Sequence, residues 1–268
     1  MNRKVSLTLT FICAVFTACA SGQEDSESKG AATGTEEDVV FFDDFKTFDS
    51  SVWTKETDEA GWTNEELQAY SPEQVKVGKD GGRSVLMLTA EWKNGKIVSG
   101  RINSKGKKSF RYGTLSASIR LPKTADGLWP AFWMMPVNFT TWPGDGEIDI
   151  MESVGYDPNV VVSTIHCNKY NNGGTAIESA RRTISNAYTE FHKYALEWTP
   201  ERMVFFVDGI KLLTYNNDGT GKDAWPFNAP FYIILNLAWG GSWGGVQGVD
   251  ESCLPATMEV DYVRVFQK

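Results

Sequence analysis

The sequence predicts an all-β domain built as a β-sandwich. From Val39 to the end of the chain, short apolar or alternating runs recur between Gly, Asn, Asp and Pro residues. These runs are rich in Val, Ile, Phe and Tyr, residues that favour strands. No long segment places its apolar residues at the spacing of a helix face. Many short strands joined by regular turns are typical of two packed sheets, and 268 residues suffice for one large domain of this class.

Each predicted strand is one such run with turn residues at its ends. Asp208-Gly209 separates VFFV from IKLL and is a strong signal for a two-residue hairpin turn. The segment around this turn is therefore expected to form two paired strands. The runs that we expect to be strands occupy residues 84–92, 112–121, 160–166, 193–199, 202–215, 231–239 and 258–266.

One further predicted strand, in the stretch GEIDIMESVG, carries three acids, Glu147, Asp149 and Glu152. In a strand, residues i and i+2 share a face, whereas residues i and i+5 do not. Glu152 should therefore point away from the other two acids. A β-bulge at Ile150-Met151 would add one residue and return Glu152 to their face. The alternative is an ordinary surface strand whose acids are solvated.

Two carboxyl groups on one face suit acid–base and nucleophilic chemistry at an acetal. One must be ionised while the other is protonated at the same pH, so their pKa values must differ. A third acid nearby can adjust this difference in pKa. Carboxyl groups about 5–5.5 Å apart favour a covalent route that retains configuration. With the bulge, the Cα atoms of Glu147 and Glu152 would lie about 13 Å apart. Two inward-leaning Glu side chains can close most of that distance, so we expect the retaining route.

Tryptophans near the acids support a sugar substrate. Trp129 and Trp133 lie in GLWPAFWMMP, Trp142 lies just before the acids, and Trp239 and Trp243 lie in NLAWGGSWGG. Flat aromatic rings pack on the apolar face of a pyranose, and an indole N–H can bond a hydroxyl. For any one of these tryptophans, packing in the core is the alternative.

The N-terminus has the pattern of an export signal. Arg3 and Lys4 precede an apolar run from Val5 to Phe16, which is too short to stay as a membrane-spanning helix. The four residues that end at Cys19, Phe-Thr-Ala-Cys, resemble a bacterial lipobox. This predicts a signal peptide over residues 1–18 and a lipid on Cys19. An ordinary signal peptide cut nearby is the alternative.

Residues 19–38 are small, polar and acidic, which predicts a flexible tether before a folded domain over residues 39–268. The acids just behind Cys19 resemble the surface-export signal of Bacteroidetes lipoproteins. We therefore expect an outer-membrane lipoprotein exposed at the cell surface, with a periplasmic or secreted protein as the alternatives. The net charge of −8 argues against a nucleic-acid partner. We expect a monomer that touches the membrane only through its lipid.

Two cysteines, Cys167 and Cys253, remain in the predicted folded domain. In an oxidising compartment an even pair can form a disulfide. The alternative is two buried thiols, which pack as small apolar side chains. The spacing of the two residues does not decide between these outcomes.

Ordered motifs over about residues 40–268 resemble glycoside hydrolase family 16, in particular its laminarinase-type branch. The strand signature Glu-x-Asp-x-(x)-Glu is present as EIDIME, in the bulged form. This resemblance implies a jelly-roll sandwich of two curved antiparallel sheets, with a concave cleft for a glucan chain. It implies a retaining endo-glycosidase acting on β-1,3- or mixed-linkage β-1,3-1,4-glucans. The other matching stretches begin at residues 64 (NEELQAYS), 99 (SGRINSKGKKSFRYG), 127 (GLWPAFWMMP), 163 (STIH), 191 (FHKYALEWTPERMVFFVDG), 225 (WPFNAPFYIILNLAWGG) and 260 (VDYVRVF).

The same resemblance implies roles for individual residues. It makes Glu147 the nucleophile, Asp149 a supporting acid and Glu152 the general acid/base. No cofactor is expected for catalysis. Asp261 matches a position that helps to bind a structural calcium ion in many members. The residues expected to bind the substrate are Asn64, Arg101, Trp129, Trp133, Trp142, His166, Trp239 and Trp243.

Two other functions fit parts of the pattern. The same machinery could act on an algal galactan, as in agarases, porphyranases and carrageenases. A sulfated galactan would favour a basic binding site, however, and this chain is acidic. A noncatalytic sugar-binding sandwich would be expected to lack at least one Glu of the pair, and both are present.

The lipobox gives a first testable expectation. Replacing Cys19→Ser should release the protein from the membrane fraction, because lipid rather than a spanning helix is expected to hold it there. Fractionation followed by immunoblotting measures this. A fully processed variant that stays with the membrane would show that the lipobox interpretation is wrong.

Overall fold

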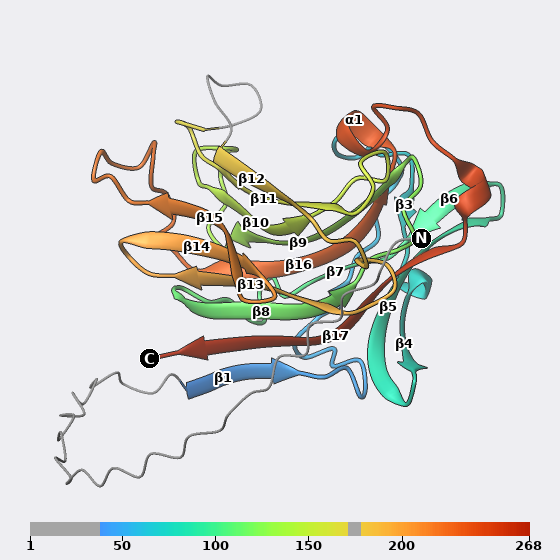
Figure 1. Ribbon diagram of the computed structural model, residues 1–268, viewed down its shortest axis with the longest axis horizontal. Coiled ribbons are helices and arrows are strands. Elements are labelled where there is room, and N and C mark those ends of the chain that lie inside the picture. Colours follow the sequence, from blue (N-terminus) through green and yellow to red (C-terminus); the bar gives the residue numbers. More distant parts are fainter. Residues whose placement is uncertain (1–37, 171–177) are drawn as a thin grey trace, which may run out of the picture. The chain divides into compact units, whose positions relative to one another are not determined.

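The computed structural model describes residues 38–170 and 178–268 (Figure 1). The predicted signal peptide and all of the predicted tether except Asp38 lie outside these residues. Within the described ranges, no helix has both the length and the apolar character needed to span a membrane.

Two β-sheets make up almost all of this part of the chain, which confirms the predicted all-β sandwich. The strand pairs are antiparallel except for the parallel pair between β3 and β6. The first sheet, called here the outer sheet, runs in the order β15 (Ile210–Asn216), β14 (Arg202–Val207), β13 (His192–Trp198), β8 (Gly113–Arg120), β17 (Ala256–Gln267), β5 (Arg83–Lys93), β6 (Lys96–Ser99) and β3 (Ala69–Tyr70), with β1 (Asp38–Asp43) on β17 and β4 (Val75–Asp80) on β5.

The second sheet carries the three acids and is called here the acid sheet. Its order is β12 (Glu178–Thr183), β11 (Val160–His166), β10 (Glu147–Glu152), β9 (Leu128–Pro136), β16 (Phe231–Trp239), β7 (Arg101–Asn103) and β2 (Thr54–Lys55). In the described part of the chain, three short helices interrupt the strands: the 3₁₀ helices η1 (Pro72–Gln74) and η2 (Glu251–Cys253), and α1 (Gly241–Gly244).

The apolar core lies between the two sheets. Strand β16 shows how its sequence serves both faces, because all nine of its residues are buried. Its odd-numbered residues, including Leu235 and Trp239, belong to the main core, whereas Tyr232 and Ile234 pack in a separate small cluster. This is the alternation expected of a strand with both faces covered. The side of the acid sheet away from the core is called here the open face.

The predicted β-bulge is present in β10. Against β9, Asp149 pairs with Trp133 and the next pair is Met151 with Phe132, so Ile150 is the additional residue. The pairing of β10 with β11 is interrupted over the same residues. Both Ile150 and Met151 are buried in the main core. Their burial leaves Glu152 on the open face, together with the other two acids.

The predicted hairpin at Asp208-Gly209 is also confirmed. These residues join β14 to β15, and their φ angles of 51° and 76° are those that a tight two-residue turn requires. Strand β12 was not expected from the sequence. Its segment ESARRT has few apolar residues, because β12 is an edge strand that turns little of its surface to the core.

The disulfide considered between Cys167 and Cys253 does not form, and both residues are thiols in the structure. Cys167 follows His166 at the end of β11, which pairs with the start of β10. Cys253 lies in η2, near Asp250, whose N–H donates to the carbonyl of Asp126 just before β9. Because β9 and β10 are antiparallel, the two cysteines lie at opposite ends of β10. A strand of this length, roughly 16–20 Å, separates them by far more than a disulfide spans.

We therefore expect two titratable thiols in the mature protein after denaturation without a reductant. Burial raises the pKa of the Cys167 thiol and raises that of Cys253 to about 11, so both stay protonated and unreactive in the folded state. Thiol counting with a chromogenic disulfide reagent measures this. A count of none would instead show that the two residues are bridged.

Candidate active site

The three acids of β10 meet on the open face, and each outer acid is held by a tryptophan. The indole N–H of Trp142 donates to Glu147 Oε2 over 2.8 Å. The indole N–H of Trp129 donates to Glu152 Oε1 over 2.9 Å. Glu147 and Glu152 are half-buried, and Asp149 between them is fully buried. The indole groups therefore orient two reachable carboxyl groups on either side of an inaccessible one.

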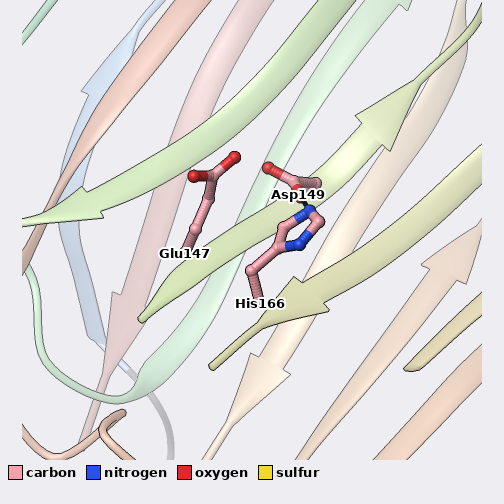
Figure 2. Close-up of side chains that lie close together, drawn as sticks. All are labelled: Glu147, Asp149 and His166. Atoms are coloured by element: carbon pink, nitrogen blue, oxygen red, sulfur yellow. Dashed lines mark ion pairs between the residues drawn. The ribbon is translucent and has the colours of Figure 1, made fainter. Parts of the chain in front are cut away.

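His166 completes the group from the neighbouring strand β11. Figure 2 shows Glu147, Asp149 and His166 pointing toward one another, with Asp149 in contact with the imidazole. The distance from His166 Nε2 to Asp149 Oδ2 is 3.1 Å. Asp149 also shares a hydrogen bond with Glu147. The buried acid thus connects the histidine to Glu147.

The pKa values of these acids are all displaced upward. Burial, followed by the charge of Asp149, raises the pKa of Glu147 to about 8, while His166 and the Trp142 N–H act in the opposite direction. Burial also raises the pKa of Asp149. Burial and the charges of Asp149 and Glu147 raise the pKa of Glu152 well above its usual range. Burial and mutual repulsion therefore prevent the three close acids from all being ionised at one pH, so the group holds protons that isolated carboxyl groups would lose.

The same group offers the donor atoms of a metal site. One ligand atom each from Glu147, Asp149 and His166 lies within 4.8 Å of the others, the one such group among the described residues. Glu147 and Asp149 already share a hydrogen bond, Asp149 Oδ2 lies 3.1 Å from His166 Nε2, and the acids can perform proton transfer without an ion. The absence of a catalytic cofactor stays a prediction.

A second cluster lies on the β7 side of the open face, around Arg101. Its guanidinium forms an ion pair with Glu56 and lies 5.0 Å from the ring centre of Trp133 and 5.4 Å from that of Trp62. Arg101 is only 6% exposed, and burial of a cation requires such partners. The predicted substrate residues Arg101 and Trp133 are therefore brought together. Trp133 lies on β9, directly beside the acids, whereas Arg101 lies on β7, which strands β9 and β16 separate from β10.

Asn64 lies close to this cluster through a chain of polar contacts. Its side-chain N–H donates to Glu66 over 3.2 Å, and Glu66 also accepts from Gln68 and Tyr70. The Tyr70 hydroxyl in turn accepts from Asn236 over 3.2 Å. These bonds join the NEELQAYS segment to the centre of the acid sheet.

Several residues of the open face were not expected from the sequence. Asn236 accepts from the Trp133 indole over 2.7 Å, and Glu56 holds both Arg101 and Asn103. The single polar residue inside the apolar run FYIILNLAW was the available signal for Asn236. Trp62 is 48% exposed, and its position just before NEELQAYS was the signal for it.

The assignment of Trp239 to the substrate is wrong. Its side chain is fully buried in the main core, because it has the same parity on β16 as Leu235 and Leu237. Trp243, from α1, is half-buried and makes an edge contact with Trp129, with ring centres 5.4 Å apart. Of the two tryptophans in NLAWGGSWGG, Trp243 is therefore the one associated with the open face.

Asp261 lies on β17, in the outer sheet, away from the acids. Its carboxylate pairs with the Arg83 guanidinium at 3.2 Å. A calcium site needs several oxygen ligands, and a cation already bound to the carboxylate does not fit that requirement. Asp261 belongs to no metal-ligand group among the residues that the structure describes. The structural calcium stays a prediction, without support from the environment of Asp261.

Comparison with known proteins extends this picture. Residues 62–264 match the family model of glycosyl hydrolases family 16. A β-glucanase from Rhodothermus marinus is 36% identical over 280 residues, which cover 99% of this chain and 96% of the relative. The crystal structure of the laminarinase from Rhodothermus marinus matches with a TM-score of 0.80 and 38% identity, over 87% of this chain and 98% of that one. A family 16 protein of a Bacteroides ovatus mixed-linkage glucan locus, in complex with G4G4G3G product, matches with a TM-score of 0.73 and 44% identity, over 85% of this chain and 100% of that one.

The raised pKa values predict that the acid group reduces stability at alkaline pH. A carboxyl whose folded pKa is above its unfolded value favours folding below about pH 4.5, and that contribution is lost as the pH rises through about 8. The wild type should therefore lose unfolding free energy between pH 5 and pH 8.5. In the Glu147→Gln variant this loss should be smaller by about 1 kcal/mol or more. Urea unfolding at both pH values measures this.

The matched control is Glu197→Gln on the exposed side of the outer sheet, which should follow the wild type. If the unfolding free energy of Glu147→Gln fell with pH as much as that of the wild type, ionisation of Glu147 would not be what reduces stability.

Proposed function

Since the chain belongs to glycosyl hydrolase family 16, we propose that it is a retaining endo-β-1,3(4)-glucanase with Glu147 and Glu152 as its reacting groups. The chain is a glycoside hydrolase with the jelly-roll sandwich of that family. The observation that carries the residue assignment is the bulge at Ile150, which brings both acids to one face. Each of them is oriented there by an indole N–H.

In the first step, the Glu147 carboxylate attacks the anomeric carbon of the sugar. The bond to the leaving oxygen breaks, and Glu152 gives its proton to that oxygen. This leaves a glycosyl ester on Glu147 and an ionised Glu152. In the second step, Glu152 takes a proton from water, and the water oxygen replaces Glu147 at the same carbon. Two inversions retain the β configuration.

The neighbouring residues support this division of roles. His166 and the Trp142 N–H favour the charged form of Glu147, as a nucleophile requires. Burial, together with repulsion from both other acids, favours the protonated form of Glu152, as a proton donor requires. Asp149 contacts both His166 and Glu147 and so holds the nucleophile in place. Through these contacts, a change in the charge of Glu147 during the reaction affects Asp149 and His166 as well.

A β-glucan is the substrate class that the relatives support. The similar proteins include a β-glucanase and a laminarinase, and one neighbour holds a mixed-linkage glucan product. Hydrolysis of an algal galactan is not favoured, and a noncatalytic sandwich does not explain two oriented glutamates. We further propose that the enzyme acts as a monomer, anchored at the cell surface through Cys19, where it would meet a polysaccharide too large to enter the cell.

Neutralising either reacting acid should abolish hydrolysis. We expect Glu147→Gln and Glu152→Gln each to lower kcat on laminarin and on mixed-linkage β-glucan by about 10³-fold or more, because each acid is needed in a two-step displacement. Reducing-sugar release measures this, with agarose as the galactan comparison and circular dichroism to verify folding. Glu197→Gln, outside the open face, serves as the control.

Near-normal activity in either folded Gln variant would contradict the assignment of the reacting groups. Cleavage of agarose but of neither glucan would instead contradict the substrate class.

A further inference from the structure

The acid sheet continues past β10 and β11 to the edge strand β12 (Figure 1). Arg181 belongs to this strand. Glu152 pairs with Val162 of β11, and Val162 pairs with Arg181. Residues directly opposite one another in paired strands point to the same face. Arg181 is therefore on the open face, two strand spacings from Glu152, or roughly 10 Å. The adjacent residue, Ala180, packs against the core, as this alternation requires.

Arg181 has a fixed partner in the loop that follows β10. Its guanidinium forms an ion pair with the carboxylate of Asp157. The loop is held to β9 because the Gly155 N–H donates to the Leu128 carbonyl over 2.8 Å, and within the loop the Asp157 N–H donates to the Val154 carbonyl over 3.1 Å. A side chain at Gly155 would collide with the Ala125 carbonyl, so the close packing of this loop depends on glycine. Asp157 is thus positioned independently of Arg181.

Stability alone does not account for this pair. The side chain of Arg181 is 59% exposed and that of Asp157 is 29% exposed, and such surface pairs contribute little to folding. A guanidinium has five N–H donors, and one carboxylate leaves some of them available. Available donors beside a carboxylate acceptor, at the edge of an open sheet, can bind the adjacent hydroxyl groups of a sugar ring.

The residues paired with Glu152 from strand to strand form a row across the open face. The two ends of this row differ in how firmly they could hold a sugar. Toward β7 the row passes Ala131 and Asn236 and ends at the buried Arg101. That end is lined by aromatic rings, whereas the β12 end has one exposed ion pair. In a double displacement the glycosyl part occupies the site during both steps, whereas the leaving sugar must depart before water can attack. The firmer β7 end therefore suits the glycosyl part, and the β12 end suits the leaving sugar.

We propose that Arg181 and Asp157 form a subsite for a glucosyl residue on the leaving-group side of the bond that is cleaved. The proposal rests on the proposed function and makes the pair a determinant of specificity rather than of the chemical step. An unsubstituted sugar fits the paired donor and acceptor. A substituent on its hydroxyl groups would remove their hydrogen bonds to Asp157.

Two substrates with the same glycosyl part test this proposal. One is an aryl β-glycoside of a β-1,3-linked glucose disaccharide, which places no sugar on the leaving-group side. The other is a β-1,3-linked glucose tetrasaccharide, which does. We expect Arg181→Ala and Asp157→Asn each to lower kcat/KM on the tetrasaccharide by about tenfold, the loss of one or two hydrogen bonds to a charged group. On the aryl glycoside, kcat/KM should stay within about twofold of wild type.

The matched control is Arg182→Ala, because the adjacent arginine points to the opposite face of β12 and should leave both substrates unaffected. Thermal unfolding verifies that the exposed Arg181 can be replaced without loss of the fold. Equal losses on both substrates, or no loss on the tetrasaccharide, would overturn the subsite. A wild-type enzyme that cleaves neither β-glucan substrate would overturn the proposed function, and this inference with it.

Discussion

The additional residue in β10 is the constraint on which the site depends. A regular strand would place Glu147 and Glu152 on opposite sides of the acid sheet, with one of them in the apolar core. By inserting Ile150, the chain buries two consecutive apolar residues, Ile150 and Met151, and returns the next side chain to the open face. The main core thus stabilises the same bulge that assembles the acids. Loss of the bulge would affect packing and chemistry together.

Concentrating three acids on one face carries an electrostatic cost, and the surrounding residues moderate it. Burial and mutual repulsion raise the pKa values of all three, so the group holds protons that isolated carboxyls would lose. The tryptophan N–H groups and His166 oppose this effect at specific oxygen atoms. The result is an asymmetric group rather than three equivalent acids. Such asymmetry is what a proton donor and a nucleophile need when they work at one pH.

The two arginines of the open face, Arg101 and Arg181, differ greatly in how deeply they are buried. Arg101 is buried among rings and acids near β7, while Arg181 is exposed on the edge strand β12. A buried cation is held in one geometry by its partners, and an exposed one keeps donors free for a ligand. A substrate that lies across the strands would therefore meet a firm site on one side of the acids and a more open one on the other.

The sequence by itself determined the strand class, the hairpin at Asp208-Gly209, the bulge and the grouping of the three acids, because each depends on local alternation and turn chemistry. Tertiary structure decided which face of each strand meets the core. Period-two alternation groups residues by face but does not say which face is covered when both are apolar. For that reason Trp239 was assigned to the substrate and lies in the core, while Asn236 on the same strand was missed. The separation of Cys167 from Cys253 and the place of Arg181 beside the acids likewise follow from strand order, which depends on contacts between residues distant in the sequence.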